Sequence, residues 1–295
     1  MRLRSFCALR LGAVILGLWP SFAQAAPEYL GTTSWRSRDP RLGGMSAIEL
    51  SADGIRFTAL SDRGAVTTGR FARDEGGRIT AIDAAPLHLL KGAGDAPLKP
   101  RRADSEGLAI ASDGTAYVSF EGASRVLRYP RLDGPAENLP EAQAFRKLPP
   151  NSALEALAIA PDGTLYTLPE GRLDSREPIP VWRLHKGAWE RAFTIPKLGR
   201  FLPVGADFGP DGKLYILERQ FDGLAGFASR VRRFTTEGAR TGTGETVLQT
   251  ELGTHFNLEG LAVWRDAQGI RLTLISDDNF RFFLSTQIVE YRIFD

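Results

Sequence analysis

Residues 104–121 read Asp-Ser-Glu-Gly-Leu-Ala-Ile-Ala-Ser-Asp-Gly-Thr-Ala-Tyr-Val-Ser-Phe-Glu. The stretch has an acidic start, a short apolar run, an Asp-Gly pair and a second apolar run that ends in an acid. Asp-Gly between two apolar runs is a strong hairpin signal, because both central residues of a type I′ turn need positive φ. The stretch therefore predicts two antiparallel strands joined by a tight turn, followed by a third strand at Arg125–Tyr129.

This pattern recurs along the chain, at residues 44–63, 151–168, 204–218 and 257–278. Copies about 50 residues apart are the signature of a repeat architecture, and four short strands per copy are typical of a β-propeller. We therefore expect an all-β fold with five blades of four strands. A sixth blade is the alternative, if the stretch from Thr67 to Arg102 contains another sheet.

The two ends of the chain predict how the ring closes. Tyr29–Trp35 reads as a strand without a hairpin partner, and the last repeat has only three strands, the third at Gln287–Phe294. A closed propeller leaves no free sheet edge, so the N-terminal strand should complete the C-terminal blade. In the second repeat we expect the outermost strand at Ala144–Leu148. Residues 26–295 should form one domain.

Residues 1–25 resemble a secretory signal peptide. Arg2 and Arg4 precede an apolar run at Leu11–Trp19 and a small-x-small site at Ala23–Ala25, which predicts cleavage and a periplasmic or secreted protein. The apolar run is short for a bilayer span, although an uncleaved anchor is the alternative. After cleavage we expect no membrane span.

The mature composition narrows the classes of partner. Cleavage removes the single cysteine, Cys7, which excludes disulfides and cysteine ligands. It also leaves 34 basic against 35 acidic residues, and such a near-neutral chain gives no support for nucleic-acid binding. We expect a monomer that binds a small anionic or ester substrate.

Carboxylates recur at the ends of the strands that would line the central channel. Propeller geometry should gather four acids, one from each of four repeats, at one mouth: Glu106, Glu155, Asp207 and Glu259. Further acids should lie on the same rim: Asp62, Glu121, Glu170, Glu218, Asp277 and Asp278. One alternative is structural, since a repeated acid can bind the backbone amides of a neighbouring blade.

The functional interpretation is a site for a hard cation. Converging carboxylates raise one another's pKa unless a cation compensates, and oxygen ligands favour Ca²⁺, with Mg²⁺ second. The candidate ligands are Glu106, Glu155, Asp207, Glu259 and Asp277. The candidate catalytic residues are Glu106, Glu259 and His255, and the candidate substrate-binding residues are Arg63, Arg102 and Arg219. No organic cofactor is expected.

Several motifs resemble those of the phytase-like family, named for an esterase-like activity of phytase. They are Gly43-Gly44-Met45-Ser46 with Ser61-Asp62-Arg63-Gly64, Asp104-Ser105-Glu106-Gly107-Leu108-Ala109, Glu155-Ala156-Leu157-Ala158, Asn257-Leu258-Glu259-Gly260-Leu261-Ala262 and Ser276-Asp277-Asp278-Asn279-Phe280. The resemblance implies a propeller that hydrolyses phosphate or carboxylate esters. Because fold similarity alone does not determine chemistry, a non-catalytic propeller that binds a ligand or protein partner is the alternative.

Overall fold

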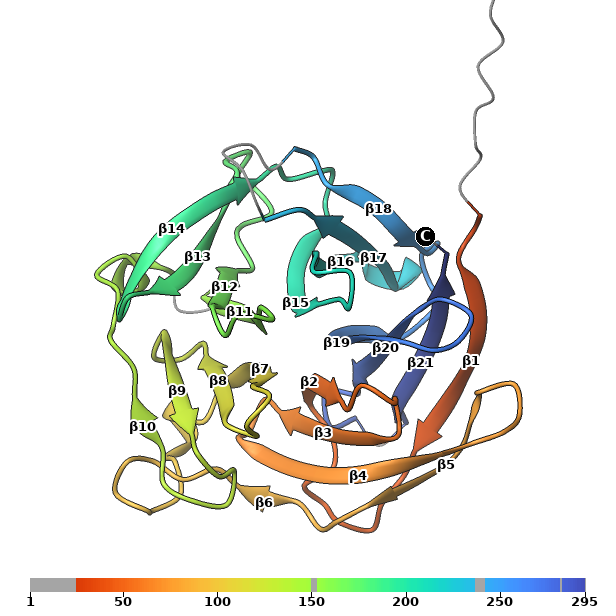
Figure 1. Cartoon of the computed structure of the whole chain (residues 1–295), viewed down its shortest axis with the longest axis horizontal. Coiled ribbons are helices and arrows are strands. Elements are labelled where there is room, and N and C mark those ends of the chain that lie inside the picture. The colour runs from red at the N-terminus through yellow and green to blue at the C-terminus, as the bar shows by residue number, and fades with distance from the viewer. Residues whose placement is uncertain (1–24, 150–152, 237–241, 282, 295) are drawn as a thin grey trace, which may run out of the picture.

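The computed structural model describes residues 25–149, 153–236, 242–281 and 283–294, which form five antiparallel sheets around a central axis (Figure 1). Blade 1 contains β2 (Met45–Leu50), β3 (Arg56–Ser61), β4 (Ala65–Arg73), β5 (Ile79–Ala84) and the short β6 (His88–Leu89). Blade 2 contains β7 (Ser105–Ile110), β8 (Ala116–Phe120), β9 (Arg125–Tyr129) and β10 (Glu137–Asn138). Blade 3 contains β11 (Leu154–Ile159), β12 (Leu165–Pro169), β13 (Ile179–His185) and β14 (Ala188–Ile195).

Blade 4 contains β15 (Leu202–Phe208), β16 (Leu214–Phe221), β17 (Phe227–Phe234) and β18 (Glu245–Gln249). Blade 5 contains β19 (Asn257–Arg265), β20 (Ile270–Asp277) and β21 (Thr286–Ile293), and its fourth strand is β1 (Glu28–Trp35). Figure 1 shows β1 beside β21, so the first and the last strands lie in one sheet. The predicted five blades and their closure by the N-terminal strand are confirmed.

The strand pairing decides two predictions, the possible sixth blade and the outermost strand of blade 2. The stretch from Thr67 to Arg102 adds β4, β5 and β6 to the sheet of blade 1, so it forms no sixth blade. The prediction of an outermost strand at Ala144–Leu148 is wrong. Residues Phe145–Lys147 form a 3-10 helix, and β10 completes the sheet of blade 2 instead. Phe145 is buried, and its ring contacts Trp182 and Trp189 of blade 3, so it fills the contact between two blades rather than joining a sheet.

The innermost strand of each blade carries a register shift close to its start. A β-bulge places two residues opposite one and so redirects a side chain. The shifts fall at equivalent positions of the five blades, and the residues within them are Ser46, Glu106, Glu155, Val204 and Glu259. The repeated bulge therefore positions the first ring of candidate site residues.

The predicted signal peptide lies outside the described residues, apart from Ala25. Among the residues that are described, no helix has the length and apolarity needed to cross a membrane.

Candidate functional site

Three glutamates project from equivalent bulges toward one mouth of the channel. Glu106, Glu155 and Glu259 come from blades 2, 3 and 5, whereas blades 1 and 4 have Ser46 and Val204 at this position. Burial, followed by the charges of Glu155 and Glu259, raises the pKa of Glu106 well above its usual value. Burial and neighbouring glutamates do the same for Glu155. The predicted convergence of these three side chains is therefore present in the structure.

A second ring of side chains lies at or near the end of the second strand of each blade. The strand registers place five residues at equivalent positions: Asp62, Glu121, Glu170, Arg219 and Asp277. Four blades thus present a carboxylate at this position, and blade 4 presents an arginine. The two rings together put seven carboxylates and one arginine around the same mouth.

Glu218, expected on this rim, lies inside blade 4 instead. Its side chain is fully buried and accepts hydrogen bonds from Arg230, at 2.6 Å, and from Arg232. Successive residues of a strand point to opposite faces, so the one-residue difference between Glu218 and Arg219 decides which of them faces the mouth.

Arg219 connects three blades at the mouth. Its Nη1 donates to Asn257 Oδ1 at 2.7 Å and to Glu259, and its Nη2 donates to Glu170 Oε1 at 3.2 Å. Asn257 Nδ2 donates to Glu259 Oε1 at 2.8 Å and to Asp277 Oδ2 at 3.2 Å. Burial raises the pKa of Glu259 to about 7, although the charge of Arg219 opposes that shift. This side of the mouth therefore carries its own compensating cation.

The opposite side of the mouth has carboxylates in excess. Asp104, Glu106 and Glu121 each offer an oxygen, and these three atoms lie within 4.8 Å of one another. Glu121 also lies close enough to Glu155 for the charge of Glu121 to raise the pKa of Glu155. Carboxylate oxygens at this spacing fit the ligand preferences of Ca²⁺ or Mg²⁺. Of the predicted ligands, Glu106 belongs to this group and Glu155 adjoins it, whereas Glu259 and Asp277 belong to the Arg219 network.

Asp207 does not join these carboxylates. It lies three residues beyond the bulge position of β15, and its Oδ2 accepts the Val263 backbone N–H of blade 5 at 2.6 Å. Glu49 occupies the equivalent position of β2, and the Ile110 backbone of blade 2 slightly lowers its otherwise raised pKa. Both residues line a cavity at the other end of the channel, with the residues that follow the inner strands. For Asp207, the structural alternative holds: it binds an unpaired amide of a neighbouring blade.

His255 lies between blades 4 and 5. Its Nε2 is 2.6 Å from the Tyr291 hydroxyl, and the centre of its ring is 6.0 Å from that of Tyr29. Tyr29 and Tyr291 belong to the two outer strands of blade 5. Among the described residues, no hydrogen bond or ion pair joins His255 to Glu106 or Glu259, so the structure does not bring it into the site.

The other two predicted arginines lie at the rim. The Arg63 guanidinium stacks on the Phe280 ring, 3.5 Å from its centroid, and Arg63 follows Asp62 directly. Arg102 is exposed at the end of a 3-10 helix, and its carbonyl accepts a hydrogen bond from Arg125 at 2.6 Å. Arg63 is therefore held in a fixed orientation at the mouth, whereas the structure shows no such constraint on the side chain of Arg102.

Asp104 and Asn257 were missed as site residues, although the repeated motifs contain a signal for both. Each precedes the bulge glutamate of its blade by two residues, in Asp-Ser-Glu and Asn-Leu-Glu. Residues at this spacing at the start of a strand share a face. The spacing therefore could have placed both side chains beside their glutamates.

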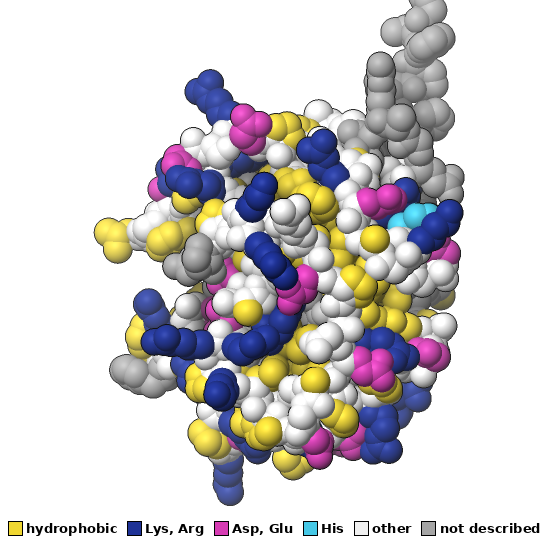
Figure 2. Space-filling view, turned by 90° about the vertical axis from the view of Figure 1, so that its left-hand side faces the viewer, with side chains coloured by type: hydrophobic (Ala, Val, Ile, Leu, Met, Phe, Trp, Pro, Cys, Tyr) yellow, Lys and Arg dark blue, Asp and Glu magenta, His cyan; other side chains and the backbone are white. Residues whose placement is uncertain are grey.

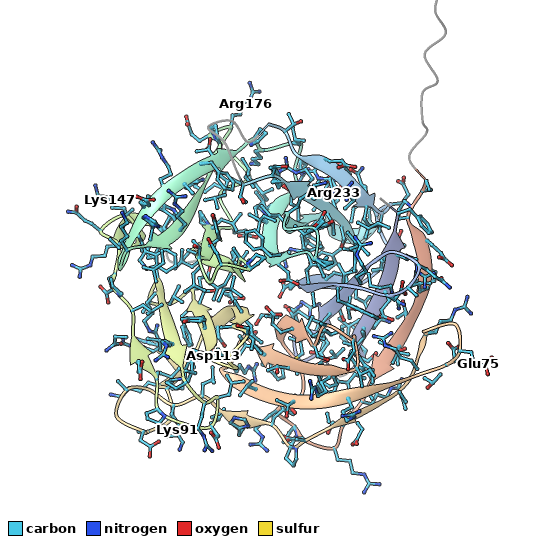
Figure 3. The ribbon with its side chains drawn as sticks, viewed as in Figure 1. Glu75, Lys91, Asp113, Lys147, Arg176 and Arg233 are labelled. Carbon is cyan, nitrogen blue, oxygen red and sulfur yellow. The ribbon has the colours of Figure 1, made fainter. Side chains whose placement is uncertain are left out.

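Charged side chains elsewhere are distributed differently. Glu75, Lys91, Lys147 and Arg176 project from the outer rim, away from the axis (Figure 3). On the side of the molecule that Figure 2 shows, Lys and Arg side chains are interspersed with Asp and Glu. The accumulation of carboxylates at the mouth is therefore a local property.

Fold and site define a five-bladed β-propeller with a carboxylate-rich channel mouth. A family model described as "Phytase-like: Esterase-like activity of phytase" matches residues 40–280, so the chain belongs to this family. The resemblance drawn from the motifs is thereby confirmed.

Three solved structures illustrate similarity to more distant proteins. A catalytically inactive virginiamycin B lyase from Staphylococcus aureus with quinupristin is 15% identical, with 84% of this chain and 82% of that chain covered and a TM-score of 0.43. A streptogramin B lyase is 14% identical, with 91% and 88% covered and a TM-score of 0.43. The PQQ-bound aldose sugar dehydrogenase from Streptomyces coelicolor is 14% identical, with 91% and 100% covered and a TM-score of 0.44. No curated protein matches the chain.

Proposed function

We propose that this protein is a secreted or periplasmic hydrolase of phosphate or carboxylate esters that uses a divalent cation at the channel mouth. The observation that carries the proposal is the group of Asp104, Glu106 and Glu121, whose oxygens lie within 4.8 Å of one another. Half-buried like charges at this distance are unfavourable unless protons or a cation compensate. The family's description as esterase-like supports the choice of reaction.

Asp104, Glu106 and Glu121 would hold the cation, with Glu155 beside them, and Ca²⁺ is the preferred ion. A bound cation supplies Lewis-acid polarisation of the ester oxygen. Glu259, whose pKa of about 7 suits proton transfer near neutrality, would take the proton from the attacking water. Arg219 holds Glu259 in position, and Arg63 would bind the charge that develops on the ester.

A substrate panel tests the reaction and its dependence on the cation. Phytate, p-nitrophenyl phosphate, p-nitrophenyl butyrate and a lactone would be assayed with calcium and with chelator. We expect turnover of at least one ester class, loss of that turnover in chelator, and a fall of about 100-fold or more in Glu106→Gln. Glu141→Gln, at a half-exposed surface ion pair, is the matched control and should behave as wild type.

Calorimetric titration with calcium separates binding from catalysis. Calcium should bind the wild type and Glu141→Gln, and its affinity for Glu106→Gln should fall sharply. Binding without turnover would favour the alternative, a non-catalytic propeller that binds a ligand or protein partner. Absence of calcium binding, with no effect of chelator on activity or melting, would contradict the cation mechanism.

A further inference from the structure

A cavity of about 470 Å³ opens beside the carboxylate group, between blade 1 and the connection to blade 2. One wall is apolar and contains Leu89, Leu98 and Ala103. The other wall is charged and contains Asp62, Arg63 and Asp104. Because Asp104 also belongs to the three-carboxylate group, the cavity and the proposed cation site share a wall. A molecule in this cavity would have one end at the site and the other against leucine side chains.

Backbone and side-chain hydrogen bonds hold the segments that line the cavity in place. The Leu98 N–H donates to the Leu90 carbonyl at 3.1 Å, and the Leu90 N–H donates to the Gly64 carbonyl at 2.8 Å. Ser105 Oγ donates to the Ser61 carbonyl at 2.7 Å, which fixes blade 2 against blade 1. Pockets of this size that are already formed are typical of small-molecule sites.

The apolar wall is accessible. Leu89 is 44% exposed although it lies in a strand, and Leu98 is half-buried in the connection that covers β6. An apolar group that packs on both leucines would be removed from water, which favours binding in proportion to the apolar area buried. The leucine and alanine side chains of this wall offer no hydrogen bond or charge to a phosphorylated or heavily hydroxylated group.

The charged side chains beside the cavity also favour a substrate with little negative charge. Asp62, Asp104 and Glu106 lie near the cavity, and the positive side chain in its wall is Arg63. A polyanion such as phytate carries several phosphate groups, whereas the cavity wall offers one arginine to bind them. A neutral ester needs no further cationic partners, since one arginine suffices for the single charge that develops during its hydrolysis.

We propose that this cavity is an acyl-binding or aryl-binding subsite and that the substrate is a carboxylic ester with one apolar group, rather than a polyphosphate. The proposal rests on the proposed function for its reaction but on the cavity for its specificity. The ester group lies between Arg63 and the Asp104 carboxylate group, and the apolar group contacts Leu89 and Leu98.

A chain-length series tests the subsite. With p-nitrophenyl acetate, butyrate and hexanoate, KM of the wild type should fall by about tenfold or more as the chain lengthens. Leu98→Gln and Leu89→Gln should abolish that dependence of KM on chain length. Leu252→Gln, at a partly exposed leucine of the connection between blades 4 and 5, is the matched control and should keep the dependence. Faster turnover of phytate than of every ester, or an unchanged series in both variants, would overturn the proposal.

A binding measurement distinguishes failure of the subsite from failure of the proposed function. The probe is 4-phenylbutan-1-ol, which contains no ester, and its binding is followed by saturation-transfer NMR and calorimetry. Binding to the wild type and to Leu252→Gln but not to Leu98→Gln would support the subsite even if no substrate is hydrolysed. Ester hydrolysis without binding of this probe and without chain-length dependence would leave the proposed function intact and eliminate the subsite.

Discussion

Arg219 divides the channel mouth into two electrostatically different halves. It occupies the position at which the other four blades have Asp62, Glu121, Glu170 and Asp277. Its hydrogen bonds to Glu170 and Glu259 compensate the side formed by blades 3 to 5. The carboxylates of blade 2 lie outside this network. A single residue at a repeated position thus compensates the carboxylates of blades 3 to 5 and leaves those of blade 2 outside its network.

We expect Arg219→Met to destabilise the protein by about 3 kcal/mol at pH 8, because removal of one partner leaves buried carboxylates uncompensated. The loss should be smaller at pH 5. Arg219 lowers the pKa of Glu170 and Glu259, so without it both carboxyls take up protons more readily as the pH falls. Urea unfolding at the two pH values measures this difference. Arg172→Met, at an exposed ion pair with Asp174, is the control and should lose little stability at either pH. Equal losses of stability for Arg219→Met at both pH values would contradict the prediction.

Asp207 gives a second prediction at this scale, at the opposite end of the channel. Burial raises its pKa to about 7, and burial followed by the charge of Asp207 raises the pKa of Glu49 well above its usual value. A carboxyl with a raised pKa binds more protons in the folded state than in the unfolded state. Its contribution to stability is therefore complete below the unfolded pKa of about 4 and lost as the pH rises toward 7.

Asp207→Asn should therefore flatten the decline in stability between pH 5 and pH 8, because the amide oxygen can still accept the Val263 N–H but carries no charge. Melting curves in chelator across this range measure the slope. Asp113→Asn is the control, since hydrogen bonds from Thr115 lower the pKa of Asp113 and it should not titrate within this range. Identical slopes for Asp207→Asn and wild type would show that Asp207 does not titrate there.

At the scale of elements, two loops leave the mouth between second and third strands. Residues 170–178 connect β12 to β13, and Lys197 Nζ donates to the carbonyls of Leu173 and Ser175 at 2.9 Å. Residues 222–226 connect β16 to β17, and the tip of this loop, Leu224, is fully exposed. Both loops stand on rigid hairpins next to Glu170 and Arg219, which is where loops set specificity on a stable scaffold.

We expect replacement of residues 222–226 by a two-residue turn to alter the relative kcat/KM of different esters while the melting temperature changes by less than about 3 °C. The residues removed bury no side chain in the core. Shortening the stretch 171–180 should likewise change preference more than stability. Steady-state kinetics and thermal melts of each variant test this. A variant that simply unfolds would show that its loop is a structural plug.

The inner hairpins could be predicted from the sequence, and the outer strands could not be predicted equally well. Inner strands are buried, and those of blades 1 to 4 are followed by Asp-Gly turns, so their apolar runs are distinct. Glu106, Glu155 and Glu259 could be predicted from their near-identical contexts, Glu-(Gly/Ala)-Leu-Ala. The outermost strand of blade 2, β10, has only two residues, both exposed, and no apolar run. The sequence pattern therefore favours a strand at Ala144–Leu148 instead. Burial of Phe145 between blades is a tertiary effect that no local pattern reveals.

The site residues could be predicted only in part. The predictions for Asp207, Glu218 and His255 were wrong because they depend on how strands pair and blades pack. Asp207 and Glu218 are acids near strand ends, but Asp207 lies at the other end of the channel, three residues beyond the bulge of β15. Glu218 precedes Arg219 by one residue, so its side chain points to the opposite face, where it binds Arg230 and Arg232. Placing them correctly requires the pairing of β15 with β16. Placing His255 correctly requires the packing of blade 4 on blade 5, which brings its side chain to the Tyr291 hydroxyl.

At the scale of the whole molecule, β1 holds the ring closed. It pairs with β21 from Glu28 opposite Arg292 to Trp35 opposite Thr286. Leu30 and Trp35 are each 5% exposed, and the Trp35 ring packs edge-on against Phe57 of blade 1 at 5.3 Å. Thr33 Oγ1 also donates to the Ile79 carbonyl of blade 1 at 3.2 Å. The strand therefore completes blade 5 and joins it to blade 1, so the geometry of the mouth depends on it.

Deletion of residues 26–35 should lower the melting temperature by more than about 10 °C, since loss of a buried tryptophan alone costs about 3–5 kcal/mol and the deletion also exposes the edge of β21. A synthetic peptide of residues 26–36 added in trans should restore the melting temperature in proportion to its concentration, because it binds the folded ring as a missing strand. The same peptide with Trp35→Ala should restore far less, as its contact with Phe57 is lost. Calcium binding should recover together with stability if the mouth is assembled by the closed ring. A deletion variant that melts like the wild type would show that blade 5 is stable with three strands and that β1 does not close the propeller.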